Sequence, residues 1–355
     1  MTTYSNQVTQ LREAYLNKNV VITGGHGFKG YWFALLLHEL GANVSIVGIR
    51  SDYNYLEINL DGINSYECDV TDPVSPKELI TSLDPDYLFH LAAQPLVSRG
   101  FEQPEMTFET NVMGTVHVLE AARNVSGPLS MVNVTTDKVY KDQKQSKGYV
   151  EDDVLMGIDP YSSSKSCSEL VTFSYNESFF KGTEKIVSTC RAGNVLGGGD
   201  FAINRIVPDL ARGLINNEPV TIRNFNSIRP YQHVLDALFA YALLAANQMK
   251  DPNIAGSYNV GPNEESILYT HEIVDYAVDS YPTLNIIDES SKEDFPETEI
   301  LKLDSSKYRK TFDWSPHWAS KEDILYNTFN WYNLLKSGKS DIDISLQQIR
   351  NFLND

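Results

Sequence analysis

Cysteine is scarce in this chain of 355 residues, where Cys68, Cys167 and Cys190 are the three present. They show no CxxC spacing, and an odd, scattered set forms neither a disulfide scaffold nor a zinc knuckle. We therefore expect buried free thiols. No group of histidines and acids has the spacing of metal ligands either, so the sequence predicts no metal site.

Long apolar runs are also absent. No stretch approaches the roughly 18 residues that a membrane-spanning helix needs. The first eighteen residues are polar and lack the apolar centre of a signal peptide. The longer apolar runs, at residues 31–37 and 237–246, have the length of core helix segments. These features predict a cytoplasmic protein that does not act on a membrane.

Basic residues are under-represented. Lys and Arg number 29 against 47 Asp and Glu, which gives a net charge of −18 and a pI near 4.8. Such an acidic surface repels the phosphate backbone of nucleic acids, so a nucleic-acid partner is disfavoured. A small anionic ligand is still compatible with this composition, if a basic or amide-lined pocket holds it.

The first half of the chain does contain a regular alternation of short β-branched segments and longer amphipathic ones. Predicted strands lie at residues 19–24, 43–48, 66–70, 87–92, 131–136 and 185–191. Predicted helices lie at residues 29–40, 76–82, 104–124 and 160–180. Because neighbouring parallel strands need a crossover helix, the alternation predicts an α/β fold with a Rossmann-type, doubly wound parallel sheet.

After about Arg191 the predicted elements are shorter and more mixed. Helices are predicted at residues 203–215, 230–248, 270–280 and 321–335, and strands at 220–223 and 257–260. We expect them to form a smaller mixed α/β lobe at the carboxyl edge of the sheet, where ligands of such sheets bind. The predicted division is residues 1–191 and 192–355, partly interleaved, with the last fifteen or so residues as a docked or frayed tail.

The first predicted strand runs into a glycine-rich turn, TGGHGFKG, at residues 23–30. Its glycines have the spacing GxxGxxG. Gly24 permits the tight turn, Gly27 lets the backbone approach a pyrophosphate, and Gly30 allows the helix to pack closely on the strand. The N-terminus of the following helix offers free N–H groups to phosphates. This position, between the first strand and the first helix, predicts a dinucleotide site.

The end of the second strand bears on which dinucleotide is bound. An acid there accepts the ribose 2′-hydroxyl of NAD, whereas an arginine accommodates the 2′-phosphate of NADP. Gly48 stands where the acid is most expected, and Arg50 and Asp52 follow. The residues favour NAD without excluding NADP.

A tyrosine and a lysine open the predicted helix at 160–180. Tyr161 and Lys165 are four residues apart and so lie on one helical face. A lysine near a phenol lowers the pKa of its hydroxyl, which makes the tyrosine a usable general base near neutral pH. The preceding strand ends in Thr136, Asp137 and Lys138 at the same edge of the sheet.

Together with HLAAQP at residues 90–95 and TNVMGT at 110–115, these motifs resemble the extended short-chain dehydrogenase/reductase family, from Val20 to about Trp331. Further segments are similar to the CDP-glucose 4,6-dehydratases of that family. They are GFKG at 27–30, AAQPLV at 92–97, RAGNVLGGGD at 191–200, IRN at 222–224 and RPYQHVL at 229–235. The glycine turn departs from the TGHTG usual in that group, and Tyr231 stands where a tryptophan is usual.

The resemblance implies an NAD-dependent hydro-lyase that converts CDP-glucose to CDP-4-keto-6-deoxyglucose and water, for the deoxysugars of surface polysaccharide. It implies oxidation at C4, elimination across C5 and C6, and return of hydride to C6. Tyr161 would be the base at the C4 hydroxyl, tuned by Lys165, and Thr136 would orient that hydroxyl. Asp137 would be the acid at the C6 oxygen and Lys138 the base at C5.

The resemblance also implies binding residues: the first domain would hold NAD(P) and the second lobe the nucleotide sugar. The cofactor set is Gly24, Gly27, Phe28, Lys29, Gly30, Asp69, Val70, Ala92, Ala93, Gln94, Asn111, Tyr161 and Lys165. The substrate set is Gln94, Asn194, Arg205, Arg223, Arg229 and His233. Asn194 and Arg229 are assigned to the diphosphate, because a guanidinium fork matches phosphate oxygens. His233 is equally compatible with a structural role.

A homodimer is the partner that the resemblance implies, because the helices equivalent to 104–124 and 160–180 pair between subunits of such enzymes as a four-helix bundle. Both segments are rich in apolar positions, which could equally face the sheet. These positions are Phe108, Val112, Val116, Leu119, Leu170, Phe173 and Phe179.

Three other functions stay open at this point. The first is a 4,6-dehydratase of a UDP-, dTDP- or GDP-sugar. The second is an epimerase or reductase of nucleotide sugars, which Asp137 disfavours because redox chemistry at C4 alone needs no acid at C6. The third is a non-catalytic dinucleotide-binding protein, which has no chemical reason to keep Thr136, Tyr161 and Lys165.

Overall fold

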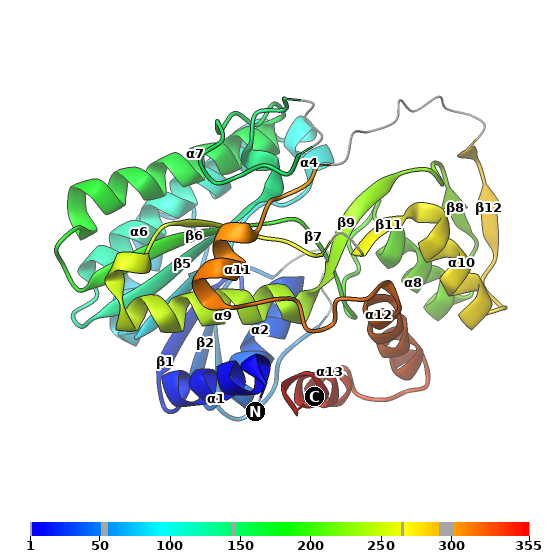
Figure 1. Ribbon diagram of the computed structural model, residues 1–355, viewed down its shortest axis with the longest axis horizontal. Helices are drawn as coiled ribbons and strands as arrows, with labels where there is room; N and C mark the ends of the chain where they lie inside the picture. The colour runs from blue at the N-terminus through cyan, green and yellow to red at the C-terminus, as the bar shows by residue number, and fades with distance from the viewer. Residues whose placement is uncertain (1, 51–55, 144–146, 264–265, 291–300, 355) are drawn as a thin grey trace.

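The computed structural model describes residues 2–50, 56–143, 147–263, 266–290 and 301–354 (Figure 1). Its centre is a seven-stranded parallel sheet of order β10-β6-β5-β4-β1-β2-β3. The strands are β1 (Asn19–Thr23), β2 (Asn43–Gly48), β3 (Ile63–Glu67), β4 (Tyr87–His90), β5 (Leu129–Thr136), β6 (Lys185–Ala192) and β10 (Ser257–Val260). The doubly wound α/β fold predicted from the sequence is therefore confirmed.

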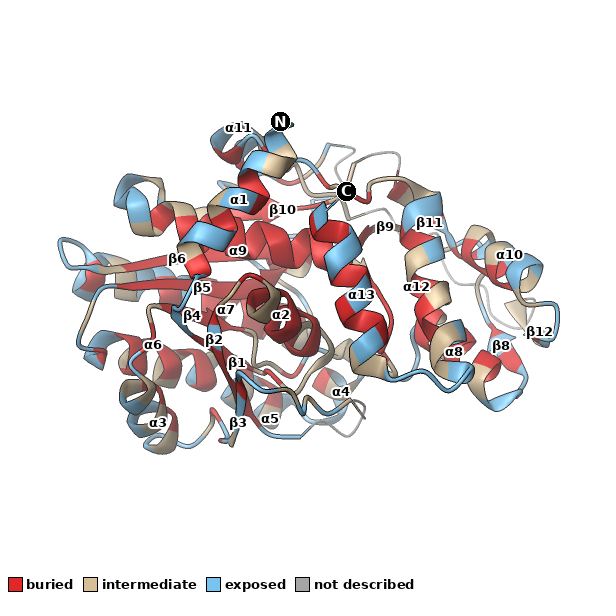
Figure 2. Ribbon diagram, turned by 90° about the horizontal axis from the view of Figure 1, so that it is seen from below, coloured by how far each residue is buried: buried red, intermediate tan, exposed pale blue. Residues whose placement is uncertain are grey.

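Both faces of the sheet are covered by helices, which is why the strands β1, β2, β4, β5 and β6 are almost entirely buried. Every residue of β5 is buried. One face carries α1 (Thr3–Tyr15), α2 (Phe28–Glu39), α9 (Val234–Lys250), α11 (Ser306–Phe312) and α13 (Asp341–Asn354). The other carries α3 (Ser75–Leu83), α6 (Gly114–Asn124) and α7 (Pro160–Tyr175). Figure 2 shows α2 and α9 buried along most of their length.

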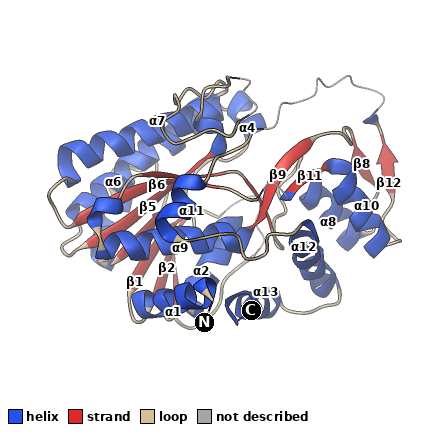
Figure 3. Ribbon diagram, in the orientation of Figure 1, coloured by secondary structure: helices blue, strands red, loops and turns tan. Residues whose placement is uncertain are grey.

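A smaller mixed α/β lobe lies beside the sheet (Figure 3). Strands β7 (Asn194–Leu196), β9 (Ile228–His233) and β11 (Ile267–Tyr269) form one small sheet, and β8 (Val220–Ile222) pairs with β12 (Ile286–Asp288). Its helices are α8 (Ile206–Asn216), α10 (Thr270–Ser280) and α12 (Lys321–Lys336). The lobe is interleaved with the large sheet, because α9 and β10 lie between β9 and β11 in the chain, where α9 packs against β5 and β10 pairs with β6.

The structure corrects several predicted boundaries. The helix predicted at 104–124 is α5 (Pro104–Phe108), a π-helical turn η1 (Glu109–Met113) and α6, and α7 likewise ends in a π-helical turn η3 (Asn176–Phe180). The third strand begins at Ile63 and not at Tyr66. The helix predicted from Pro230 begins at Val234, because residues 228–233 pair with β11 as a strand.

Both ends of the described chain are docked helices. The sequence analysis predicts no helix over α1, and α13 is the tail that it expects to be docked or frayed. Arg350 of α13 pairs with Glu39 of α2 at 2.9 Å. The remaining short elements are α4 (Val97–Glu102), η2 (Asp137–Val139) and η4 (Pro252–Ile254). None of the helices in the described ranges is both long and apolar enough to cross a membrane.

Candidate active site

The turn between β1 and α2 approaches the end of β4 so closely that a side chain cannot fit. Gly24 has φ +71°, and a Cβ there would lie 2.6 Å from the backbone nitrogen of Ala92. A Cβ on Gly30 would lie 2.3 Å from the carbonyl oxygen of Gly24. Helix α2 has Gly27 as its N-cap residue and so no side-chain cap, which leaves first-turn N–H groups for an anion. This cradle fits the pyrophosphate of a dinucleotide.

Tyr161 and Lys165 project from the first two turns of α7. Asp159 caps this helix by accepting a hydrogen bond from the backbone nitrogen of Ser162 at 3.0 Å, and Pro160 occupies the first turn. The Tyr161 hydroxyl hydrogen-bonds to the Thr136 side chain. The Lys165 ammonium donates to the carbonyl of Val134 at 2.9 Å. The helix start therefore places both side chains against the end of β5.

The three residues that end β5 and start η2 complete this centre. The Thr136 hydroxyl donates to the Asp137 carboxylate at 2.9 Å, and the Lys138 ammonium lies 3.3 Å from the same oxygen. The Asp137 side chain is only 3% exposed and that of Lys138 is 35% exposed. The structure thus brings together Thr136, Asp137, Lys138, Tyr161 and Lys165, which the sequence predicted to act together.

The electrostatics of this centre differ from the prediction in one respect. Burial raises the pKa of Tyr161, and the charges of Lys138 and Arg205 oppose that rise without cancelling it. The predicted lowering of the Tyr161 pKa by Lys165 is therefore wrong for this structure, because desolvation outweighs the nearby cations. Burial also lowers the pKa of Lys165 to about 8, with Glu169 opposing the shift and Lys29 adding to it.

A buried ion pair behind the centre was missed by the sequence analysis. Arg191 of β6 pairs with Glu169 of α7 at 2.9 Å, and their side chains are 4% and 2% exposed. Glu169 also accepts hydrogen bonds from the hydroxyls of Thr135 and Thr189. Glu169 follows Lys165 by four residues, as Lys165 follows Tyr161. This i, i+4 spacing is the feature of the sequence that could have identified Glu169.

The loops predicted to contact the cofactor are fixed by side-chain hydrogen bonds. Asn111, in the π-helical turn η1, accepts from the backbone nitrogen of Gln94 at 2.8 Å and donates to its carbonyl at 3.1 Å. Asn111 also donates to Ser164 of α7 at 2.9 Å. After β3, Asp69 is exposed, and the carbonyl of Val70 accepts from His117 at 2.8 Å. Gln94 and Asn111 thus position the loop beside Tyr161's helix.

The residues predicted to distinguish NAD from NADP follow β2. Arg50 pairs with Glu57 at 2.8 Å on the surface. Asp52 lies outside the residues that the structure describes. Of the cysteines, Cys68 and Cys190 are buried and free, as expected, whereas the free Cys167 is partly exposed.

The predicted substrate residues fall in different places. Arg205 lies 3.4 Å from Asp200, and its charge acts on Tyr161. Arg229 is partly exposed on β9. Asn194 pairs in register with Tyr231 in the small sheet.

His233 is fully buried where β9 ends and α9 begins. Its ring packs edge-on to those of Trp32 and Trp318, and its Nδ1 accepts from the backbone nitrogen of Leu235 at 3.3 Å. Burial lowers the pKa of His233 to about 3, which keeps the ring neutral. This arrangement is that of a structural helix cap.

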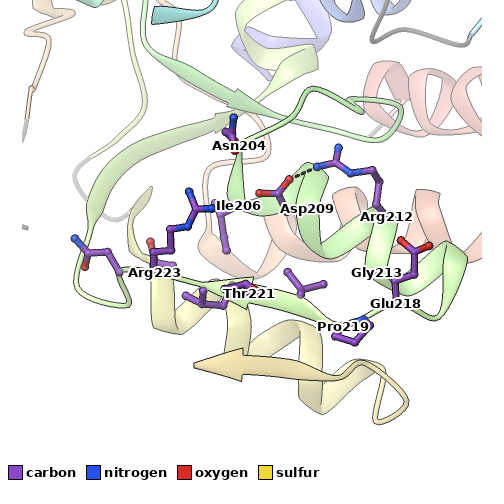
Figure 4. Close-up of a pocket in the computed structure, with 13 residues that line it drawn as sticks. Asn204, Ile206, Asp209, Arg212, Gly213, Glu218, Pro219, Thr221 and Arg223 are labelled. Carbon is purple, nitrogen blue, oxygen red and sulfur yellow. Dashed lines mark hydrogen bonds and ion pairs between the residues drawn. The ribbon is translucent and has the colours of Figure 1, made fainter. Parts of the chain in front are cut away.

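A pocket of about 400 Å³ opens in the small lobe between α8 and β8 (Figure 4). Arg223 lines it, and so do Asn204 and Ile206 on either side of Arg205 in the chain. Asp209 and Arg212 form an ion pair on its wall (Figure 4). Arg205, whose charge acts on Tyr161, lies between two of the pocket-lining residues in the chain.

The chain matches the family described as GDP-mannose 4,6 dehydratase over residues 21–325. It is 37% identical over 352 residues to the CDP-glucose 4,6-dehydratase of Salmonella typhimurium, covering 95% of this chain and 96% of that one. It is 28% identical to the CDP-paratose 2-epimerase of Salmonella typhi, over 88% of this chain and 98% of the relative.

Solved structures share the fold at lower identity. The epimerase Mth375 of Methanothermobacter thermautotrophicus superposes with a TM-score of 0.79 at 22% identity, covering 97% of each chain. The NDP-hexosamine 5,6-dehydratase TunA of tunicamycin biosynthesis gives 0.74 at 21% identity, over 92% of this chain and 99% of that one.

The fold and site define an extended short-chain dehydrogenase/reductase, with a dinucleotide cradle after β1 and a Tyr–Lys pair at the end of β5. Within that class, this chain belongs to the GDP-mannose 4,6 dehydratase family.

Proposed function

We propose that this protein is an NAD-dependent CDP-glucose 4,6-dehydratase, a hydro-lyase that forms CDP-4-keto-6-deoxyglucose and water. The observation that carries the proposal is the Asp137–Lys138 pair beside Tyr161. Redox chemistry at C4 alone needs one proton-transfer group, whereas loss of water across C5 and C6 needs an acid and a base in addition. The relationship to the Salmonella typhimurium enzyme supports CDP-glucose as the substrate.

The residues that would hold NAD surround the β1–α2 turn, the loops after β3 and β4, and the start of α7. They are Gly24, Gly27, Phe28, Lys29, Gly30, Asp69, Val70, Ala92, Ala93, Gln94, Asn111, Tyr161 and Lys165. NAD bound there would supply the hydride chemistry of the reaction, in which hydride leaves C4 of the sugar and is returned to C6. NAD is favoured over NADP because Arg50, the first arginine after β2, is already paired with Glu57.

Tyr161 takes the proton from the C4 hydroxyl as C4 is oxidised. Thr136 orients that hydroxyl, since its own side chain hydrogen-bonds to Tyr161. Lys165 would bind the nicotinamide ribose, and Lys138 supplies the positive charge that acts most strongly on the phenol. The raised pKa of Tyr161 makes this positive charge important, because the buried phenol resists ionisation.

Asp137 and Lys138 carry out the elimination. The C5 proton becomes acidic once C4 is a ketone, and Lys138 removes it. Asp137 gives a proton to the C6 oxygen, which leaves as water. Both groups lie within one ion pair of 3.3 Å, so they can act on neighbouring carbons of one sugar ring. One proton passing from the Lys138 ammonium to the Asp137 carboxylate within the pair supplies the amine and the carboxylic acid that this step needs. Lys138 then gains the C5 proton and Asp137 loses its proton to the departing water, so the step restores the charges of the pair.

The nucleotide part of the substrate would extend from this centre into the small lobe. Arg205, Arg229 and Asn194 would hold the diphosphate, because arginine forks match phosphate oxygens. The pocket beside Arg223 has the size of a small-molecule site and would take the nucleoside. Gln94 would contact the sugar, and we assign His233 a structural role.

A second copy of this chain is the partner that we propose. Helix α7 packs against α5 and η1, and together they expose apolar side chains. Phe173 is 65% exposed, and Leu170, Met113 and Phe108 are also exposed. Apolar patches of this kind mark interaction surfaces. The cytoplasmic location expected from the sequence stays a prediction.

The test is a mass-spectrometric panel of the purified protein with NAD and, separately, CDP-, UDP-, dTDP- and GDP-hexoses. Loss of one water from CDP-glucose, without net reduction of the cofactor, is the expected result. Loss of water from another nucleotide sugar would keep the mechanism and replace the substrate. A change of stereochemistry without loss of water would overturn the dehydratase assignment.

A further inference from the structure

One lysine of the glycine turn has a position that holding a pyrophosphate does not explain. Lys29 is the second residue of α2, and its ammonium reaches the hydroxyl of Tyr241 on α9 at 3.3 Å. The same ammonium lies 5.7 Å from the centre of the Tyr241 ring. The side chain therefore reaches from α2 to α9.

The surroundings of Lys29 are those of the reaction centre. Asp137 and Arg205 act electrostatically on Lys29, and the same two residues act on Tyr161. Lys29 acts in turn on Lys165. The hydrogen-bond partner Tyr241 is itself influenced by Tyr161. These shared interactions place a further cation beside the residues that handle C4 of the sugar.

Charged groups of both signs act on Lys29: the cations Arg205 and Lys165, and the anion Asp137. Burial and then the charge of Arg205 lower the pKa of Lys29 to about 8, while Asp137 opposes the shift. The ammonium is nevertheless mostly charged at neutral pH. Its hydrogen-bond partner Tyr241 is a neutral hydroxyl, which does not balance the charge as a carboxylate would. A positive charge in a buried centre changes the relative stability of ligand states that differ in charge.

We propose that Lys29 sets the relative affinity of the site for the two redox states of nicotinamide. This inference rests on the proposed function, because it requires NAD to bind with its reacting ring near Tyr161. The oxidised ring carries one positive charge and the reduced ring carries none. Lys29 therefore disfavours the oxidised form and makes the bound cofactor a stronger oxidant of the C4 alcohol.

The experiment measures the binding of three ligands to the full-length protein: NAD⁺, NADH and ADP-ribose, which lacks the nicotinamide. Fluorescence of NADH reports its binding, and displacement gives the other two affinities. In K29M the ratio of the NAD⁺ and NADH dissociation constants should fall about tenfold. That change equals about 30 mV in the midpoint potential of a two-electron couple. The affinity for ADP-ribose should not change.

Three further variants serve as controls. K29Q also removes the charge but keeps a donor for Tyr241, so it gives the same comparison if K29M folds poorly. K29R keeps the charge and should keep the ratio of the unaltered protein. K181M removes a positive charge from the surface, where Lys181 is 72% exposed, and should leave all three affinities unchanged.

An unchanged ratio in both K29M and K29Q would overturn the inference. Equal weakening of NAD⁺, NADH and ADP-ribose would also overturn it, because Lys29 would then bind the diphosphate. Failure of the unaltered protein to bind either form of the cofactor would instead remove the proposed function. The two failures are therefore distinguishable.

Discussion

Lys165 is held in surroundings that favour its neutral form. Burial lowers its pKa from 10.5 to about 8, so between these two values the unfolded chain binds a proton that the folded chain has released. The free energy of unfolding therefore rises with pH from about 8 to 10.5. At neutral pH the buried charge destabilises the fold, which is a cost of keeping a cation at the reaction centre.

K165M should accordingly be inactive and yet more stable than the unaltered protein at pH 7. The gain is at most about 3 kcal/mol, from the size of the pKa shift at about 1.4 kcal/mol per unit. Urea unfolding at pH 7 and above pH 10 measures it, and the gain should shrink at the higher pH. A variant that is less stable at pH 7 by a similar amount would contradict this account of the Lys165 charge.

Lys138 and Tyr161 act on different protons, so their loss should have different consequences. K138A should still oxidise C4 and should stall before water leaves, with the reduced cofactor accumulating in a single turnover. The near-ultraviolet absorbance of the reduced cofactor follows this step. We expect product formation to fall by about 10²–10⁴-fold, the usual contribution of a general base. Product formation at the normal rate would remove Lys138 from the role of C5 base.

At the scale of elements, the sequence was sufficient where periodicity and turn chemistry agreed. Apolar patterning predicts the strand, the turn and the helix at residues 19–39. The turn itself follows from Gly24 and Gly30, because only glycine fits at these two positions. The Tyr161–Lys165 row follows from helical spacing. The Thr136–Lys138 segment follows from its place at a strand end, because parallel strands present their carboxyl ends at one edge.

Other features depend on partners that are distant in the sequence. Residues 228–233 form a strand because β11 pairs with them. No change in amino-acid composition marks the boundary between this strand and α9. The π-helical turn η1 is a local irregularity that brings Asn111 to Gln94 and Ser164. The sign of the Tyr161 pKa shift also escaped prediction, since burial is set by the whole fold.

The Arg191–Glu169 pair ties β6 to α7 behind the reaction centre. Removing one partner of a buried ion pair leaves an uncompensated charge, so E169Q should destabilise the fold by about 3–5 kcal/mol. Chemical unfolding at neutral pH measures the loss, with E177Q on the exposed face of η3 as a matched control. A loss below about 1 kcal/mol would show that the pair is not important for holding α7 in place.

At the scale of the whole molecule, two lobes meet at the reaction centre and an apolar helical face is left exposed. Leu119, which the sequence grouped with that face, is fully buried against the sheet, whereas Phe173 and Leu170 are exposed. The apolar stripes thus divide between core and surface. This division explains why the sequence alone could not separate packing from assembly.

F173E should weaken the proposed homodimer without unfolding the subunit, because its side chain is exposed in the single chain. Light scattering after size-exclusion chromatography should give a dimer for the unaltered protein and a monomer for the variant. Y326E, at an exposed position of α12 away from α7, is the control and should remain dimeric. A monomeric unaltered protein would contradict the assignment of this face.

The central claim is that one hydrogen travels from C4 to C6 of the same sugar while water leaves. CDP-glucose labelled with deuterium at C4 tests it directly, with NMR and mass spectrometry of the product. The account predicts deuterium at C6, loss of the C6 oxygen, and exchange of the C5 hydrogen with solvent through Lys138. Deuterium retained at C4 of a product that keeps its C6 hydroxyl would contradict it.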